Sequence, residues 1–163
     1  MDEQMMREAL ELAREAAAEG EVPVGCVITL NGRIVGRGRN RRELGKSALA
    51  HAELEAIAEA CKTLGGWRLW QCTLYVTLEP CPMCAGAIIN ARIPRVVYGA
   101  RDAKAGSCGS VVDLFSLPYN HKPQVEQGLL EEECSAVLSR FFRDLRARRR
   151  QSAARLDDGD IQC

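Results

Sequence analysis

A histidine and two cysteines stand at a spacing that can bind a metal ion. They belong to two short motifs, His51-Ala-Glu53 and Pro80-Cys81-Pro-Met-Cys84, with 29 residues between His51 and Cys81. A Cys-x-x-Cys pair alone is weak evidence, because half of a zinc ribbon, a redox pair and chance all produce it. The sequence holds no second Cys-x-x-Cys. Two like motifs therefore cannot complete a structural site of four thiolates.

The two cysteines are expected at the start of a helix. Residues i and i+3 share one helical face, and the free N–H groups and dipole of a helix start stabilise thiolates. With His51 they make three ligands, which leaves the fourth tetrahedral position of zinc for water. Zinc lowers the pKa of such a water to about 7, which turns it into a nucleophile. We therefore predict one catalytic Zn²⁺ per chain, held by His51, Cys81 and Cys84.

Glu53 is expected beside this metal without binding it. Two residues after His51 in a helix, it points away from the metal-binding direction but stays within reach of the water. We predict that it moves protons. The alternative is that its carboxylate only interacts favourably with the dipole at the start of the helix. The combination His-x-Glu with Pro-Cys-x-x-Cys is the signature of zinc-dependent nucleobase deaminases. Their reaction needs water delivered to a ring carbon, and protons for a ring nitrogen and for departing ammonia.

Helices and strands alternate around these motifs, which predicts a three-layer α/β/α sandwich with a mixed central sheet of about five strands. The Asn31-Gly32 pair reads as a hairpin turn. We expect helices over 2–19, 52–64, 80–91 and 129 to about 149, with a small helix over 111–114. We expect strands over 22–30, 33–40, 73–78, 95–99 and 124–127, and loops over 41–50 and 105–110.

Composition restricts the class of protein. The 163 residues are 47% hydrophobic and 27% charged, which fits one globular domain. No apolar run reaches 18 residues, so no membrane span is predicted. The acidic N-terminal residues do not resemble a signal peptide, so we expect a cytoplasmic protein. Most of the eight cysteines are irregularly spaced and are interpreted as small buried residues.

Net charge is zero, but seven arginines lie between Arg140 and Arg155 against the single acid Asp144. Such a segment can meet phosphates, or it can be a solvated helix end. We assign residues 1–150 to a zinc-dependent deaminase domain and expect 151–163 to form a disordered tail.

Beyond the metal motifs, the sequence closely resembles the bacterial tRNA-specific adenosine deaminases of the cytidine deaminase-like superfamily, from about residue 5 to 147. The matching stretches include Val22-Pro-Val-Gly25, Ala50-His-Ala-Glu53, Thr73-Leu-Tyr-Val-Thr-Leu-Glu-Pro-Cys81, Gly99-Ala-Arg-Asp-Ala-Lys104 and Phe141-Phe-Arg143. The metal motifs are shared with guanine and cytosine deaminases. The Gly-Ala-Arg-Asp-Ala-Lys and Phe-Phe-Arg stretches are more specific to the tRNA enzymes.

This resemblance implies conversion of adenosine to inosine at the first anticodon position of tRNA, by a homodimer that binds the anticodon stem-loop across both subunits. It implies that Glu53 is the proton shuttle and that Asn40 hydrogen-bonds the flipped-out nucleotide. It also implies RNA contacts from Arg101, Asp102, Lys104, Phe142 and Arg143. Each has a structural alternative: Asn40 can satisfy a turn, Arg101 and Lys104 can be surface charges, and one of the two phenylalanines is expected in the core.

Two stretches depart from the family pattern. The tRNA enzymes usually carry Asn-Arg-Pro where this chain has Asn40-Arg41-Arg42, and Asp-Pro-Thr-Ala where it has Ser47-Ala-Leu-Ala50. Two other functions stay open. One is an enzyme with the same chemistry on a free base or nucleotide, guanine above all. Arg101, Lys104 and the arginine-rich last helix favour RNA over this alternative, because a free base has no phosphates to meet. A non-catalytic zinc-binding RNA adaptor is argued against by the presence of Glu53.

Overall fold

A five-stranded mixed sheet forms the centre of the computed structural model, which describes residues 1–159. The strands are β1 (Gly25–Leu30), β2 (Arg33–Arg39), β3 (Cys72–Leu78), β4 (Arg95–Ala100) and β5 (Gln124–Gln127), in the order β2-β1-β3-β4-β5. β1 is antiparallel to both of its neighbours, whereas β3, β4 and β5 are parallel. Strands β2, β3 and β4 therefore run in one direction and end at the same edge of the sheet.

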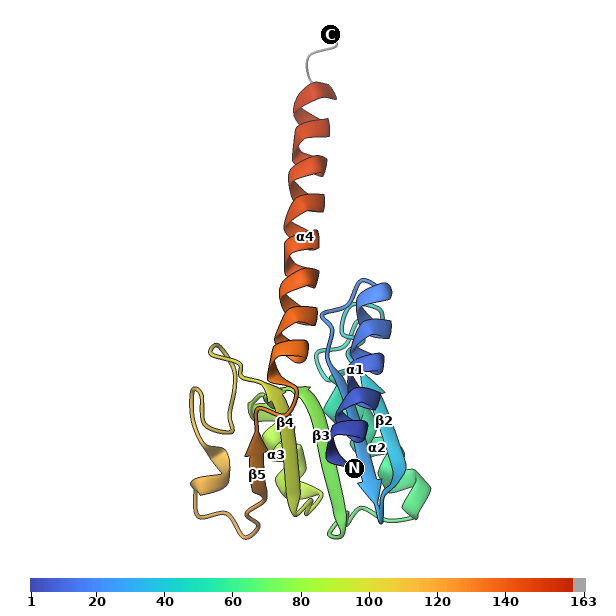
Figure 1. Cartoon of the computed structure of the whole chain (residues 1–163), viewed down its shortest axis with the longest axis vertical. Helices are drawn as coiled ribbons and strands as arrows, with labels where there is room; N and C mark the ends of the chain where they lie inside the picture. Colours follow the sequence, from blue (N-terminus) through green and yellow to red (C-terminus); the bar gives the residue numbers. More distant parts are fainter. Residues whose placement is uncertain (160–163) are drawn as a thin grey trace.

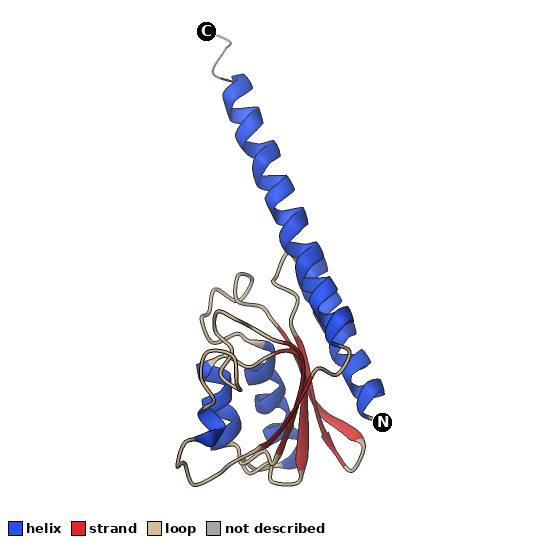
Figure 2. Ribbon diagram, turned by 60° about the vertical axis from the view of Figure 1, so that its left-hand side comes forward, coloured by secondary structure: helices blue, strands red, loops and turns tan. Residues whose placement is uncertain are grey.

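Helices cover both faces of this sheet, which confirms the predicted three-layer sandwich. Helices α1 (Asp2–Ala18) and α4 (Glu131–Gly159) lie on one face, and α2 (Ala52–Leu64) and α3 (Pro82–Asn90) on the other (Figures 1 and 2). Alternate residues of each inner strand face the two layers. In β3, Leu74 and Val76 pack in the core beneath α2 and α3, whereas Tyr75 packs beneath α1.

Helix α2 lies unusually close to strand β2, and Gly38 makes this possible. A Cβ atom at Gly38 would come within 2.0 Å of the carbonyl oxygen of Ala52. Only glycine allows such a close approach of backbone to backbone. Because Ala52 is the first residue of α2, this contact fixes the helix end that carries His51 and Glu53.

Several element boundaries differ from the sequence prediction. The hairpin turn is confirmed, since Asn31 and Gly32 have φ of 51° and 75°. β1 begins at Gly25 rather than at residue 22, because Pro23 has no N–H and the N–H of Val24 turns back to the carbonyl of Val22. The predicted helix over 111–114 is instead a short 3₁₀ helix, η1 (Leu114–Ser116), whose start is capped by the Asp113 side chain.

Helix α4 is longer than predicted. The sequence pattern predicted an end near 149 and disorder from 151, but the helix continues to Gly159 and projects beyond the body of the molecule (Figures 1 and 2). Residues 151–156 are mostly alanine, leucine, glutamine and arginine, with one serine, and no glycine or proline stands between 151 and 158 to end the helix before Gly159. The rest of the expected tail, 160–163, lies outside the described residues. Within residues 1–159, no helix is both long and apolar enough to cross a membrane.

Candidate metal centre and active site

The candidate metal ligands meet where α2 and α3 begin. His51 is the N-cap of α2, Cys81 is the N-cap of α3, and Cys84 lies one turn into α3. Their ligand atoms all lie within 4.8 Å of one another. His51 Nδ1 is 3.7 Å from Cys81 Sγ and 3.5 Å from Cys84 Sγ. Sequence spacing alone could not give this meeting point, because it depends on the packing of both helices on one face of the sheet.

This donor set fits a zinc ion. Imidazole and thiolate ligands bind zinc at about 2.0 and 2.3 Å, which places two of them roughly 3.5 Å apart around one tetrahedral centre. The S···N separations of 3.5 and 3.7 Å match that spacing. Three ligands of this type, and not four, are grouped in the described part of the chain. A fourth coordination position would therefore be left for a small ligand, as in catalytic sites.

Hydrogen bonds join the three candidate ligands, so the pKa of each depends on its neighbours. A hydrogen bond from the Cys84 thiol, aided by His51, lowers the pKa of Cys81 to about 4 despite burial. The pKa of Cys84 is raised, because its proton is held by Cys81 and the thiol is buried. A hydrogen bond to Cys81 raises the pKa of His51. Metal binding must displace these protons, so metal affinity should rise with pH.

Glu53 lies in the first turn of α2 and is 4% exposed. Burial raises the pKa of its carboxyl group to about 7. A carboxyl group that titrates near neutral pH can both accept and release a proton, which is what acid–base catalysis requires. A cation bound at the neighbouring donors would lower this pKa, because it favours the charged carboxylate. The packing thus supplies the environment that the predicted proton shuttle needs.

A cavity of about 500 Å³ opens in front of these groups, a size typical of sites for small ligands. It lies at the sheet edge where β2, β3 and β4 end. Its lining includes the predicted site residues Asn40, His51, Glu53, Cys81, Arg101, Asp102, Lys104 and Phe142. Two predicted residues are not in the lining: Cys84 is fully buried, and Arg143 lies on the exposed surface of α4.

Asn40 has a structural role as well as a place in the cavity. Its Nδ2 donates to the carbonyl of Val22 at 3.1 Å, and its Oδ1 accepts from the N–H of Arg42 at 3.1 Å. The turn interpretation of this residue therefore describes a real set of contacts. One amide N–H and one lone pair of the side chain have no partner in these two bonds, so Asn40 keeps capacity for a ligand.

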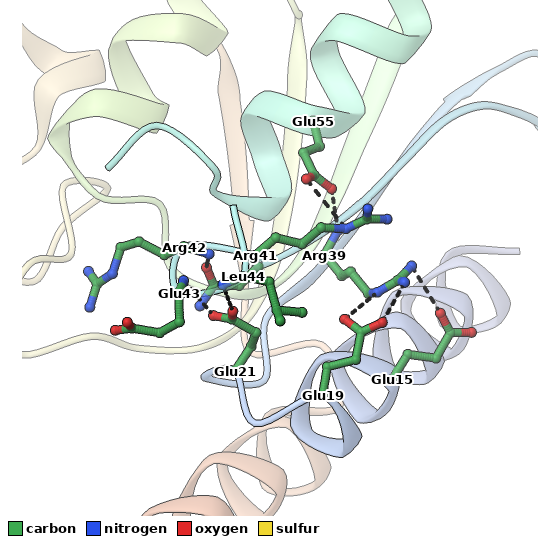
Figure 3. Close-up of polar contacts among 10 residues, drawn as sticks. Glu15, Glu19, Glu21, Arg39, Arg41, Arg42, Glu43, Leu44 and Glu55 are labelled. Carbon is green, nitrogen blue, oxygen red and sulfur yellow. Dashed lines mark hydrogen bonds and ion pairs between the residues drawn. The ribbon is translucent and has the colours of Figure 1, made fainter. Parts of the chain in front are cut away.

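The loop after Asn40 is fastened by Glu21, which sequence reasoning missed. Glu21 is 1% exposed, and its carboxylate accepts the N–H groups of Glu43 at 3.2 Å and Leu44 at 2.7 Å (Figure 3). The carbonyl of Arg42 accepts the N–H of Ser47 at 3.1 Å. An acid among polar residues after a helix gives no sequence signal for this role. The loop that borders the cavity is thus held by bonds to its own backbone.

A second buried glutamate, also missed from sequence, fastens the loop after β4. Glu79 is 2% exposed and accepts the N–H groups of Asp102 at 3.3 Å, Cys108 at 3.1 Å and Ser110 at 3.1 Å. It also accepts the Ser110 hydroxyl at 2.5 Å. Asp102 Oδ1 in turn accepts the N–H of Lys104 at 3.0 Å, so Asp102 shapes this loop in addition to lining the cavity.

The two phenylalanines of α4 have different surroundings, but neither belongs to the core, so the expectation of one core phenylalanine is wrong. Phe142 lines the cavity and is 39% exposed, whereas Phe141 is half-buried and lines a separate hollow between α1 and α4. Their rings meet edge to face with centroids 5.5 Å apart. Phe142 therefore offers an aromatic surface at the mouth of the cavity.

Fold and site together define a deaminase of the cytidine deaminase-like fold. Residues 1–146 match the MafB19-like deaminase family, and the chain belongs to that family. It is 48% identical over 158 residues to the tRNA-specific adenosine deaminase of Bacillus subtilis, covering 96% of this chain and 98% of the relative. It is 47% identical over 148 residues to the tRNA-specific adenosine deaminase of Streptococcus pyogenes, covering 90% and 93%. Within the family, the chain is thus a member of the tRNA-specific adenosine deaminases.

Solved structures agree with this placement. A tRNA:A34 deaminase that edits A to I at the wobble position of transfer RNA is 47% identical, with a TM-score of 0.81 over 83% of this chain and 99% of the other. The guanine deaminase of Bacillus subtilis is 37% identical, with a TM-score of 0.60 over 75% and 82%. Both identity and structural similarity are higher for the tRNA enzyme.

Proposed function

We propose that this protein deaminates adenosine to inosine at the wobble position of tRNA, with zinc held by His51, Cys81 and Cys84. The observation that carries the proposal is the buried Glu53 beside three zinc-type donors, two of which, His51 and Cys81, line the same cavity as Glu53, in a chain 48% identical to a tRNA-specific adenosine deaminase. We assign this activity to a deaminase domain of residues 1–150 and place the enzyme in the cytoplasm.

When bound, the zinc ion supplies a Lewis acid that activates water for attack on the ring carbon bearing the amino group. The protein's own groups handle the protons. Glu53 takes a proton from the attacking water, delivers it to the ring nitrogen and later assists departure of ammonia. Its burial helps this role, because burial raises the pKa of its carboxyl group and so favours holding a proton, whereas a cation at the neighbouring donors would lower that pKa and favour releasing it.

The two loops fastened by Glu21 and Glu79 orient the substrate. Asn40, with one amide N–H to spare, would hydrogen-bond the flipped-out nucleotide. Arg101 and Lys104 would meet phosphates, Asp102 would contact the RNA from the same loop, and the exposed ring of Phe142 would stack on a base. Arg143 would meet the RNA outside the cavity. In a homodimer, RNA bound across both subunits would add contacts beyond those of one chain.

Mass analysis of reaction products tests this function. The purified protein is given, separately, an anticodon stem-loop with adenosine at the wobble position, free adenosine, guanine and cytidine. We expect inosine in the stem-loop and little turnover of the free compounds. Fast deamination of guanine with no inosine in the stem-loop would instead establish the free-base alternative. Zinc and RNA binding with no turnover of any substrate would establish the adaptor.

A further inference from the structure

Three arginines close together in the chain have different surroundings. Arg39 pairs with Glu19 at 2.8 Å and with Glu15 at 3.3 Å. Arg41 approaches Glu55 at 3.6 Å. Figure 3 shows Arg41 extending toward Glu55, with Arg39 among its carboxylate partners. Both charges are thus compensated within the fold, on the side of the loop away from the cavity.

Arg42 lies in the same loop but extends away from these carboxylates (Figure 3). Among residues 1–156, whose side chains are described, none forms an ion pair with its guanidinium. Its side chain is exposed and lines the same cavity as Glu53. Its backbone, by contrast, is fixed at both ends by hydrogen bonds with Asn40 and Ser47. Arg42 thus places a guanidinium group without an ion-pair partner among the described residues at the cavity, on a backbone held by two hydrogen bonds.

The acids that line the cavity do not serve as partners for Arg42. Glu79 is occupied by the backbone of its own loop, and Asp102 accepts the N–H of Lys104. Glu53 is buried beside the metal ligands. The partner expected for the Arg42 guanidinium is therefore an anion of a ligand. A phosphate suits this role, because it accepts two N–H groups of a guanidinium at once.

Arg42 is also separated from the cations of the other loop. It follows β2, whereas Arg101 and Lys104 follow β4, and β1 and β3 lie between those strands. Three strand spacings put the starting points of the two loops roughly 14 Å apart. One phosphate can meet both groups only if the side chains converge. Two phosphates, on either side of one nucleotide, can meet them in extended conformations.

We propose that Arg42 binds a backbone phosphate of the RNA next to the target nucleotide, a different phosphate from the one met by Arg101 and Lys104. This inference rests on the proposed function, and it makes Arg42 a residue that selects polynucleotides over single nucleotides. Glu21 is then a positioning residue, because it fastens the loop on which Arg42 stands.

The test compares full-length wild type with Arg42→Gln, Arg42→Lys and Arg41→Gln. Inosine formation in an anticodon stem-loop is measured over a series of salt concentrations, with adenosine monophosphate assayed in parallel and a thermal melt for each variant. For Arg42→Gln we expect KM to rise roughly tenfold at low salt, as for loss of one charge-assisted hydrogen bond. The slope of log(1/KM) against log salt should become shallower by about 0.7, the contribution of one neutralised phosphate.

The two other variants make the result specific. Arg42→Lys should keep the wild-type salt slope, because the charge remains. Arg41→Gln removes the same charge from the same loop, but on the side facing Glu55. We expect its KM to stay within about twofold of wild type, as for an exposed ion pair.

The inference fails if Arg42→Gln leaves KM and slope unchanged, or if Arg41→Gln changes them equally. Arg42-dependent turnover of adenosine monophosphate, with no such dependence for the stem-loop, would assign the phosphate to a free nucleotide and overturn it. If wild type forms no inosine in the stem-loop, the proposed function itself fails, which is a separate and visible outcome.

Discussion

Replacing Glu79 should release the loop that carries Arg101, Asp102 and Lys104. Glu79→Ala removes both carboxylate oxygens and leaves three buried or half-buried N–H groups and one hydroxyl without their acceptor. Glu79→Gln is the matched control. Its amide oxygen can keep the N–H groups of Cys108 and Ser110, while its NH₂ group donates to the Ser110 hydroxyl. Only the longest bond, from Asp102 at 3.3 Å, is then lost.

The expected losses in the free energy of unfolding follow from the number of hydrogen bonds that each variant removes. A hydrogen bond to a charged group contributes roughly 1.5–3 kcal/mol, so the three shorter bonds would sum to roughly 4.5–9 kcal/mol. The loop can open and hydrate its N–H groups, which limits the cost. We therefore expect Glu79→Ala to lower the free energy of unfolding by roughly 3–5 kcal/mol. For Glu79→Gln we expect a loss of about 1 kcal/mol.

Urea denaturation of the purified variants measures both values, and hydrogen exchange of residues 102–110 locates the change. Glu79→Ala should also weaken binding of the stem-loop, because the loop cations lose their fixed positions. Equal stability of the Ala and Gln variants, or unchanged exchange in this loop, would contradict the prediction. Either result would mean that packing, and not the carboxylate, holds the loop.

Four further results are expected. Cys84→Ala should lose zinc and stability together, measured by metal analysis and thermal melting, and full zinc occupancy would contradict the ligand assignment. Glu53→Gln should fold and keep zinc but lose roughly 10²–10⁴-fold in rate, so turnover within about tenfold of wild type would show that another group moves the proton. Replacing Arg148, Arg149 and Arg150 with glutamine should make the slope of log affinity for the stem-loop against log salt shallower by about 0.7 for each phosphate that these arginines neutralise in the wild type. An unchanged slope would show that they contact water and not RNA. Hydrogen bonds from Arg95 and Tyr75 lower the pKa of Asp2 from 3.8 to about 2, so its stabilising effect is present above pH 3.8 and lost as pH falls to about 2. Urea denaturation of Asp2→Asn should therefore show a free energy of unfolding that depends less on pH between about 2 and 3.8 than in the wild type. An unchanged pH dependence would rule out this role of Asp2.

The metal motif could be predicted from sequence because its parts are local. Cys81 and Cys84 share one turn of α3, and His51 and Glu53 share the start of α2. The layers could be predicted as well, since buried strands alternate with amphipathic helices. The meeting of the two helix starts was implied by the known signature and not by periodicity. This meeting depends on the close approach of α2 to Gly38, which no local sequence pattern predicts.

The supports of the site could not be predicted. Glu21 and Glu79 act on residues 22 to 31 positions away in the chain, and their identity as buried anchors exists only in the fold. Arg143 stays a predicted RNA contact, but the sequence did not show that it lies outside the cavity that Phe142 lines, because a step of one residue turns it to a different side of α4. The length of α4 was also missed, because a polar, charged composition was interpreted as disorder although its residues favour helix.

Formation of inosine in the anticodon of tRNA is the activity on which the proposed function depends. It is measured by incubating the zinc-loaded enzyme with an anticodon stem-loop that carries adenosine at the wobble position. The RNA is then digested to nucleosides and inosine is quantified by mass spectrometry, with Glu53→Gln as the control. We predict inosine at that position with the wild type and almost none with the variant. Adenosine left intact by the wild type, while free guanine is deaminated, would contradict the proposed function.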